Sequence, residues 1–396
     1  MQRCRSAFGS ITVEATILLL EHDAKMLLGA RGLTVPEGVL AAADTMPEPT
    51  GDGPWVVKAQ VPVGGRGKAG GVCVVQDRAG LQEAADAICA LTIKGFPVRE
   101  LRIEEAVPDA TELYVGLVLD PATAEVVVMA SAEGGVEIEA QAETAIHRRW
   151  ARPDEASLTA ALAEVAGALP PNAARAVTEA GARIVAAWLD LDATLIELNP
   201  LFLRADGSWI AGDVRMDVDE GALPRQPGLT ALLDDRAAAY PEAIFKRDNG
   251  FDLVVVDPEG EIGLVTTGAG LSMQLIDEMT ARGLKPYNFC DIRSGGMRGD
   301  PARLVENIRR VLEGPNLKCI LVNIFAGITE LGEFAGLLLK ALDELGEVPV
   351  PLVVRLVGNG QDRADAILRA SGRGLILERD LDRAISLCAA PEVADA

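Results

Sequence analysis

The sequence predicts an α/β protein with two domains. The chain has 396 residues, of which 49% are apolar and only 4% aromatic. Its cores must therefore consist mainly of Val, Leu, Ile and Ala, as in proteins that alternate strands with helices. A chain of this length exceeds what one hydrophobic core usually organises. Between residues 223 and 249 the apolar periodicity is lost and prolines and charges accumulate, which indicates a linker between the domains.

The first half shows apolar patterns of both periods. We predict a helix over residues 19–30 and a strand, glycine loop and strand over residues 55–76. The other elements predicted here are strands at 100–106, 112–119, 124–131, 193–198 and 209–213, and helices at 81–92, 157–169 and 173–189. Residues 1–18 partly resemble a signal sequence, but Glu14 interrupts an apolar run that is too short to span a bilayer. We interpret them as an extension ahead of the first domain.

The second half alternates strands and helices regularly. Strands are predicted at residues 253–256, 262–266, 287–292, 319–325, 351–356 and 375–377, with helices at 271–282, 301–312, 331–345, 363–370 and 381–389. This order predicts a doubly wound parallel sheet, whose ligands bind beyond the carboxyl ends of its strands.

The composition argues against several classes of function. A formal net charge of −22 disfavours nucleic acid or an anionic membrane as a partner, because both are polyanions. The six cysteines are widely spaced and form no CxxC pair, so we expect reduced thiols in the cytoplasm and no metal held by sulfur. The two histidines, His22 and His147, have no nucleophilic partner beside them in the sequence, and we expect both to lie on the surface. Any phosphohistidine chemistry must then use another chain.

A glycine-rich loop is the strongest candidate for anion binding. Residues 64–71 read GGRGKAGG and place Arg66 and Lys68 between two predicted strands. Glycines let backbone N–H groups approach an anion, and the two cations neutralise phosphate charge. Lys58 on the preceding strand lies in an apolar run and needs an anionic partner. A tight hairpin with incidental basic residues, and an edge-strand lysine that reaches solvent, are the alternatives.

Three polar residues end two neighbouring strands. Glu197 and Asn199 lie in LIELNPL, and Asp213 ends WIAGD on the next strand. Their oxygens are hard ligands, suited to a Mg²⁺ ion that bridges nucleotide phosphates. They could equally be turn-forming residues. In the second half, TTGAG at residues 266–270 and FAGIT at residues 325–329 each follow a strand and could offer N–H groups to a carboxylate or phosphate, or simply form turns.

Together these segments resemble the β subunit of succinyl-CoA synthetase, a family that includes malate–CoA ligase-like relatives. The resemblance runs in order from about residue 21 to the C-terminus. The motifs that carry it are WVVKAQ, GGRGKAGG, ELYVG, VVMASAEGGVEIE, LIELNPL, TTGAGLSM, LVNIFAGI and VVRLVGNG.

The resemblance implies a fold and a set of site residues. Residues 19–230 would form an ATP-grasp nucleotide-binding domain, 231–249 a linker, and 250–396 a flavodoxin-like CoA-ligase domain. Residues implied to bind the nucleotide are Lys58, Gly65, Arg66, Gly67, Glu105 and Glu112. Asn199 and Asp213 would hold Mg²⁺, and Glu197 would be catalytic. Residues implied to bind the acid are Thr267, Gly327, Ile328 and Thr329.

The resemblance also implies a partner. The γ-phosphate of ATP or GTP would pass to a histidine of an α subunit, then to a small carboxylic acid, and CoA would displace it to form the thioester. CoA would bind mainly to the α subunit, so the β chain would act only in an αβ heterodimer or its dimer. Glu197 would meet the phosphorylated histidine.

Several positions depart from the family pattern. Residues 90–102 are shorter than usual, Thr267 replaces a substrate-contacting Asn, and Arg293 and Arg298 lie in a longer glycine segment. We hypothesise that one of these arginines recognises an acid other than succinate; a neutral loop change is the alternative. Two other functions stay open, namely a stand-alone ATP-grasp carboxylate–amine ligase and a catalytically decayed nucleotide-binding regulatory subunit.

Overall fold

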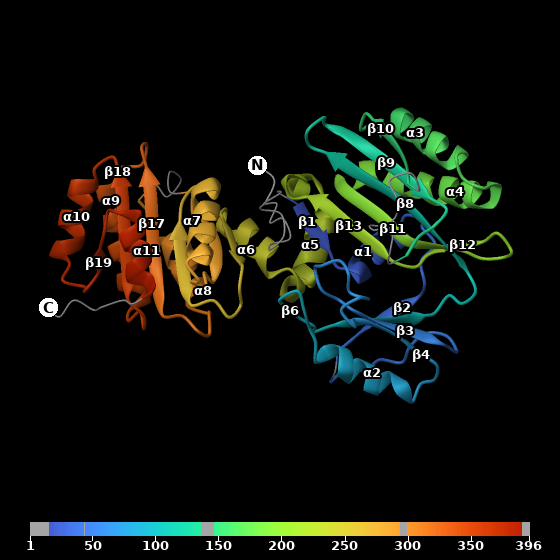
Figure 1. The fold of residues 1–396 in the computed structure, drawn as a ribbon, viewed down its shortest axis with the longest axis horizontal. Coiled ribbons are helices and arrows are strands. Elements are labelled where there is room, and N and C mark those ends of the chain that lie inside the picture. The colour runs from blue at the N-terminus through green and yellow to red at the C-terminus, as the bar shows by residue number, and fades with distance from the viewer. Residues whose placement is uncertain (1–15, 43, 136–145, 294–298, 390–396) are drawn as a thin grey trace. The chain divides into compact units, whose positions relative to one another are not determined.

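The structure is a computed structural model that describes residues 16–42, 44–135, 146–293 and 299–389. The chain divides into two compact units, Met1–Leu232 (unit 1) and Leu233–Ala396 (unit 2) (Figure 1).

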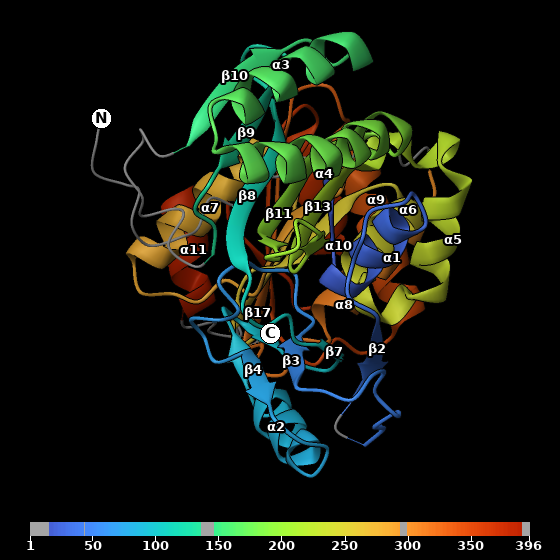
Figure 2. The same cartoon turned by 90° about the vertical axis from the view of Figure 1, so that its right-hand side faces the viewer.

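A large antiparallel sheet organises unit 1. Its strands follow the order β1-β13-β11-β8-β9-β10, with β12 also paired to β11. They are β1 (Thr16–Leu19), β8 (Thr111–Asp120), β9 (Glu125–Ser131), β10 (His147–Ala151), β11 (Ala193–Leu203), β12 (Trp209–Ala211) and β13 (Val214–Asp219). Helices α3 (Glu155–Gly167) and α4 (Pro171–Asp190) cover one face (Figure 2). The predicted helices and the β8–β9 hairpin are confirmed.

A smaller antiparallel sheet carries the glycine loop. Its order is β2-β7-β3-β4, formed by β2 (Gly38–Ala41), β3 (Trp55–Ala59), β4 (Val72–Val75) and β7 (Leu101–Glu105). Helix α2 (Gly80–Cys89) packs on it through Leu81, Ala85 and Ile88. A two-stranded hairpin, β5 (Thr92–Ile93) and β6 (Phe96–Pro97), follows this helix. The predicted strand, loop and strand are thus confirmed as β3, the glycine loop and β4.

The start of the chain differs from the predicted extension. Residues 1–15 lie outside the described residues, but Thr16–Leu19 forms strand β1 and pairs with β13. Helix α1 then spans Glu21–Gly29. Strand β13 was also missed, because its sequence VRMDVD mixes charges into a short alternating pattern. The alternation is nevertheless that of a half-buried strand, since Val214, Met216 and Val218 are buried.

A parallel sheet forms the core of unit 2. Its order is β15-β17-β18-β19, formed by β15 (Ile262–Thr266), β17 (Cys319–Ala326), β18 (Leu352–Gly358) and β19 (Ile376–Leu377). Helices α8 (Ala302–Val311), α9 (Leu331–Leu345) and α10 (Gln361–Ala370) pack on one face, and α7 (Ala269–Ala281) and α11 (Leu381–Ala389) on the other. The helices on both faces confirm the doubly wound arrangement.

Two of the predicted parallel strands pair differently. Strands β14 (Asp252–Val255) and β16 (Asn288–Asp291) form an antiparallel pair. Residues 231–249, expected as a linker, are also largely helical. They include the end of α5 (Pro227–Asp235), a 3₁₀ turn (Ala237–Ala239) and α6 (Pro241–Asn249). Pro227 and Pro241 begin helices, because proline fits the first turn, where its missing N–H is not needed.

None of the helices in the described part of the chain has both the length and the apolar character needed to cross a membrane.

Candidate active site

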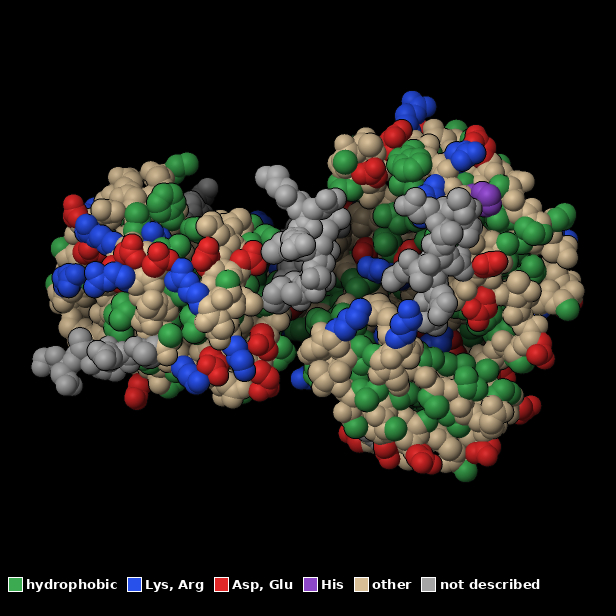
Figure 3. Space-filling model, viewed as in Figure 1, with side chains coloured by type: hydrophobic (Ala, Val, Ile, Leu, Met, Phe, Trp, Pro, Cys, Tyr) green, Lys and Arg blue, Asp and Glu red, His purple; other side chains and the backbone are tan. Residues whose placement is uncertain are grey.

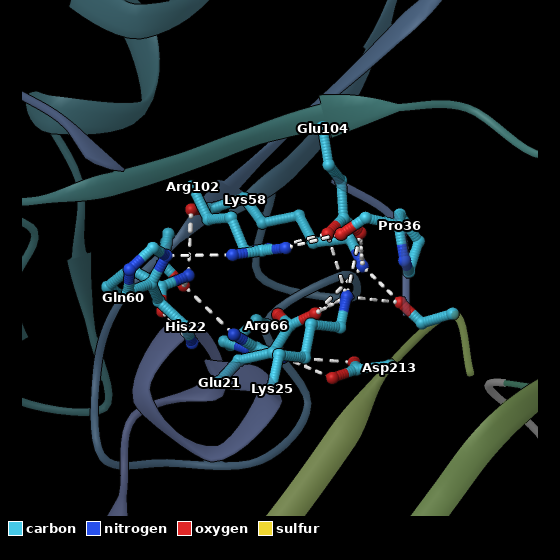
Figure 4. Close-up of polar contacts among 12 residues, drawn as sticks. Glu21, His22, Lys25, Pro36, Lys58, Gln60, Arg66, Arg102, Glu104 and Asp213 are labelled. Carbon is cyan, nitrogen blue, oxygen red and sulfur yellow. Dashed lines mark hydrogen bonds and ion pairs between the residues drawn. The ribbon is translucent and has the colours of Figure 1, made fainter. Parts of the chain in front are cut away.

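Seven charged side chains from separate segments of unit 1 meet in one place (Figure 4). We call this set the charge cluster. Its members are Glu21 and Lys25 on α1, Lys58 on β3, Arg66 in the glycine loop, Arg102 and Glu104 on β7, and Asp213 between β12 and β13. Four cations therefore face three carboxylates. The space-filling view shows lysine and arginine side chains gathered where the small sheet meets the large one (Figure 3).

Lys58 occupies the centre of the charge cluster. Its Nζ lies 2.9 Å from Glu21 Oε1 and 2.7 Å from Glu104 Oε1, and it donates a hydrogen bond of 2.6 Å to the Gly212 carbonyl. The residue is only 7% exposed. Burial opposes its charge, but the carboxylates of Glu21, Glu104 and Asp213 outweigh this effect and raise the pKa of Lys58. The need for an anionic partner is thus confirmed, and the lysine does not extend into solvent.

Glu21 joins both cations that the sequence marked as phosphate ligands. Besides Lys58, it lies 2.8 Å from Arg66 Nη2 and 2.7 Å from Lys25 Nζ. Its side chain is buried, which favours the neutral acid, but the three cations hold the pKa of Glu21 well below its usual range. An ionised carboxylate in this position keeps Lys58 and Arg66 charged and in place without a ligand.

Arg66 links the glycine loop to Asp213. Its Nη2 atom lies 2.8 and 2.9 Å from the two carboxylate oxygens of Asp213 and its Nη1 donates to the Ala59 carbonyl. Burial and the nearby Glu21 carboxylate raise the pKa of Asp213, against the opposing charge of Arg66. Arg66, which was predicted to bind phosphate, is therefore paired with Asp213, which was predicted to bind Mg²⁺.

Three members of the charge cluster are almost fully buried, namely Lys25, Arg102 and Glu104. None of them was predicted from the sequence. Lys25 Nζ lies 2.8 Å from both Glu104 oxygens and from the Gly212 carbonyl, and Arg102 Nε lies 2.6 Å from Glu104. All three are at most 2% exposed. Buried charges of this kind are tolerated when paired. A charge inside a strand was the available signal for Arg102 and Glu104, as it was for Lys58, whereas Lys25 lies on helix α1.

His22 is less exposed than expected. The ring is half-buried, and its Nδ1 lies 2.7 Å from Arg102 Nη1. Its backbone N–H donates to the Gln60 side chain at 2.9 Å. These partners are 80 and 38 residues away in the sequence, so nothing beside His22 could have indicated them. His147 is half-buried on β10.

Asn199 and Asp213 lie next to each other, as their neighbouring strands predict. The Asn199 backbone N–H donates to the Asp213 carbonyl at 3.1 Å, and Asn199 Oδ1 accepts from the Gly135 N–H at 2.6 Å. Glu112, at the start of β8, points to the same place, because its Oε2 lies 2.1 Å from where a β-carbon on Gly135 would be. The structure thus brings together Asn199, Asp213 and Glu112.

Glu197 lies on the same strand as Asn199, two residues earlier. Its Oε1 accepts a hydrogen bond of 2.8 Å from the Tyr114 hydroxyl on β8. Gly116, the register partner of Glu197, leaves room for this contact, since a β-carbon there would lie 2.8 Å from the Tyr114 oxygen. Burial and the Glu197 carboxylate raise the pKa of Tyr114, so the phenol stays a donor.

Three other residues predicted to bind the nucleotide differ in position: Gly65 and Gly67 lie in the glycine loop, and Glu105 ends β7. Gly65 and Gly67 are exposed. Glu105 is not part of the charge cluster; its carboxylate accepts the Asp52 N–H at 3.2 Å.

The predicted acid-binding residues of unit 2 follow two adjacent parallel strands. Thr267 follows β15, while Gly327, Ile328 and Thr329 follow β17, and β15 pairs with β17 in parallel register. Ile328 is 98% exposed. The structure therefore places all four residues at the carboxyl end of the sheet, where ligands of such folds bind.

Arg293 has an acidic partner in unit 2. Its Nη2 lies 2.9 Å from Asp252 Oδ2, and the same carboxyl group also contacts Lys246. Arg298 lies outside the described residues. This ion pair favours a structural role for Arg293 over acid recognition.

Comparison with known proteins identifies the family of each part of the chain. Residues 18–203 match the family model of the ATP-grasp domain, and residues 265–386 match that of CoA-ligase. The chain is 39% identical to the succinate–CoA ligase [ADP-forming] subunit beta of Chloroflexus aurantiacus, over 89% of this chain and 93% of that protein. It is 38% identical to the probable malate–CoA ligase subunit beta of Mesorhizobium japonicum, over 92% and 95% of the two chains.

Two further comparisons concern the nucleotide and the fold. The chain is 38% identical to the succinate–CoA ligase [GDP-forming] subunit beta of Thermus thermophilus, over 88% of this chain and 93% of that protein. The structure of ATP citrate lyase from Methanothrix soehngenii, in complex with citrate and coenzyme A, aligns with a TM-score of 0.67 at 19% identity. That alignment covers 94% of this chain and 99% of the other, and it shows a shared fold.

Proposed function

Because the chain belongs to the succinate–CoA ligase β-subunit family, we propose that it is the nucleotide-binding subunit of an acid–CoA ligase. The enzyme would couple cleavage of ATP or GTP to formation of a thioester between a small carboxylic acid and CoA. The observation that carries this proposal is the charge cluster: Lys58 and Arg66 lie within the residues that match the ATP-grasp domain, and Arg66 pairs with Asp213.

The nucleotide phosphates would bind to the glycine loop. Lys58 and Arg66 would supply positive charge, and Gly65 and Gly67 would let the backbone approach the phosphate oxygens. Glu105 and Glu112 would contact the nucleotide at the ends of β7 and β8. Glu21 and Glu104 would hold Lys58 in place before the nucleotide arrives.

Asn199 and Asp213 fit a Mg²⁺ site. Both side chains offer hard oxygen ligands, and a backbone hydrogen bond joins the two residues. Mg²⁺ is usually held by one or two such side chains together with substrate phosphates and water. Bound there, Mg²⁺ would neutralise charge on the β- and γ-phosphates. Asp213 must leave Arg66 to bind the metal, which frees the guanidinium for a phosphate oxygen.

Glu197 would receive the phosphoryl acceptor. We propose that a histidine of a partner α subunit takes the γ-phosphate here, and that the Glu197 carboxylate orients its imidazole and stabilises the positive charge that forms. The Tyr114 hydrogen bond fixes one Glu197 oxygen and leaves the other available for the imidazole.

Unit 2 would contribute to the acid site. Thr267, Gly327, Ile328 and Thr329 lie at the carboxyl end of its parallel sheet, while CoA would bind mainly to the α subunit. Succinate and malate, the acids in the names of the relatives, are the first to test. The five free cysteines of the described residues suit a reducing compartment, and we propose a cytoplasmic location.

Measuring ADP and GDP release tests the proposal. The chain would be purified alone and with its α-type partner, and assayed with Mg·ATP or Mg·GTP, CoA and a panel of acids. We expect turnover only with both chains, CoA and a carboxylic acid, and transient phosphorylation of the partner. Turnover by the isolated chain with an amine would support the stand-alone ligase, and nucleotide binding without turnover would support the regulatory subunit. The residues that match a CoA-ligase model argue against the former.

A further inference from the structure

The β5–β6 hairpin places a lysine beside the glycine loop. Ile93 on β5 is 1% exposed and packs in the core of the small sheet, so it anchors the hairpin. Its side chain lies 2.6 Å from where a β-carbon on Gly71 would be. The next residue, Lys94, extends over the other end of the loop, and its Nζ lies 3.6 Å from the β-carbon position of Gly65.

Lys94 adopts a backbone conformation that lysine does not favour. Lys94 and Gly95 are the two central residues of the hairpin turn, with φ of 50° and 89°. Positive φ at both positions is typical of a type I′ turn, for which Asn-Gly is the preferred pair. Lysine does not stabilise such a turn, which indicates that its side chain has another role.

The loop beneath Lys94 offers unpaired donors. Among the described residues, the backbone N–H groups of residues 64–68 donate to no protein acceptor, whereas those of residues 69–71 close the turn. No described carboxylate pairs with Lys94 or with the exposed Lys68. Such a run of free N–H groups with two free ammonium groups is suited to an anion of high charge.

We propose that Lys94 binds the terminal phosphates of the nucleotide held on the glycine loop, and so sets the preference for a triphosphate over a monophosphate. This inference rests on the proposed function and adds a residue from a separate hairpin to the phosphate site. Because the hairpin is anchored through Ile93, the backbone of Lys94 is positioned beside the loop before the nucleotide binds.

Lys94→Asn tests the inference sharply. Asn removes the charge but suits the turn better than Lys, so the variant should be at least as heat-stable as the original chain. We expect its affinity for ATP to fall about 10-fold, the loss typical of one charge-assisted hydrogen bond, and its affinity for AMP to change by less than about 2-fold. In the complex with the α-type partner, KM for Mg·ATP should rise by about the same factor as the affinity for ATP falls, with kcat nearly unchanged.

Two further variants complete the experiment. Lys94→Arg should retain ATP affinity within about 3-fold, and Arg152→Ala, which removes an exposed cation that follows β10, should leave it unchanged. If ATP affinity is unaltered in Lys94→Asn, or if the affinities for ATP and AMP fall equally, the role of Lys94 is overturned but the proposed function is not. Failure of the original chain to bind ATP at all would overturn the proposed function as well.

Discussion

Arg66 and Asp213 are 147 residues apart in the sequence, yet Arg66 Nη2 lies 2.8 and 2.9 Å from the two carboxylate oxygens of Asp213. The pair joins a proposed phosphate ligand to a proposed Mg²⁺ ligand. In the proposed complex Mg²⁺ and the phosphates would separate the two side chains, and the free energy lost from the ion pair would be offset only when both ligands bind together.

This relationship predicts strong coupling between Mg²⁺ and ATP. In the original chain we expect Mg²⁺ to tighten ATP binding at least about 10-fold. In Asp213→Asn the metal effect should shrink to less than about 2-fold, while metal-free ATP binds no more weakly, because Arg66 is released. Isothermal titration of ATP with Mg²⁺ or with EDTA measures both quantities. A full Mg²⁺ effect in Asp213→Asn would contradict the assignment, and Glu83→Gln, an exposed carboxyl on α2, is the control.

Glu21 predicts a dependence of stability on pH. Its pKa in the folded chain lies well below the value of about 4.3 in an unfolded chain. The ionised carboxylate therefore stabilises the fold fully above about pH 4.3, and this contribution is lost as the pH falls toward the folded pKa. We expect Glu21→Gln to lower stability by about 3 kcal/mol at pH 7.

Urea unfolding of both chains between pH 7 and the lowest pH at which each still folds provides the measurement. The stability difference between the original chain and Glu21→Gln should narrow below about pH 4.3. A difference that stays constant down to that limit would show that Glu21 is not held ionised by Lys25, Lys58 and Arg66. Glu83→Gln again serves as the control.

Substitutions at Glu197 and Tyr114 should slow phosphoryl transfer without weakening ATP binding. Glu197→Gln should slow phosphorylation of the α-type partner by about 100-fold or more, with ATP affinity unchanged, because the side chain does not contact the charge cluster. Tyr114→Phe removes one hydrogen bond to the carboxylate and should slow the same step by about 10-fold. Rapid-quench assays with γ-labelled ATP measure the step. Equal losses in ATP affinity would argue against this division of roles.

A side chain at position 358 should strongly destabilise unit 2. Gly358 ends β18 with φ of 134°, and a β-carbon there would lie 1.9 Å from the Ala326 carbonyl oxygen at the end of β17. Gly358→Ala should destabilise unit 2 by about 2–3 kcal/mol. Gly336→Ala in α9, where a β-carbon meets nothing within 4 Å, should instead stabilise it by about 0.5–1 kcal/mol. Thermal unfolding compares them, and similar shifts for the two variants would refute the steric account.

The sequence predicted most elements but not all their pairings. Strands β15, β17 and β18 were readable because strands buried on both faces appear as apolar runs between helices. The same signal could not show that β14 and β16 pair antiparallel, since apolar runs carry no direction. Helix α6 was not predicted, because accumulated prolines indicate a linker, although a proline such as Pro241 also begins helices.

By itself, the sequence determined the two-domain α/β organisation, the glycine loop between two strands, and the neighbouring positions of Asn199 and Asp213. Each depends on patterns or spacing within a short segment. Only the tertiary structure decided that Glu21 joins Lys58 to Arg66, that His22 contacts Arg102, and that Lys94 lies over Gly65. These contacts are set by how α1, the hairpin and the two sheets pack. Partners brought together by packing leave no periodic signal in the chain that separates them.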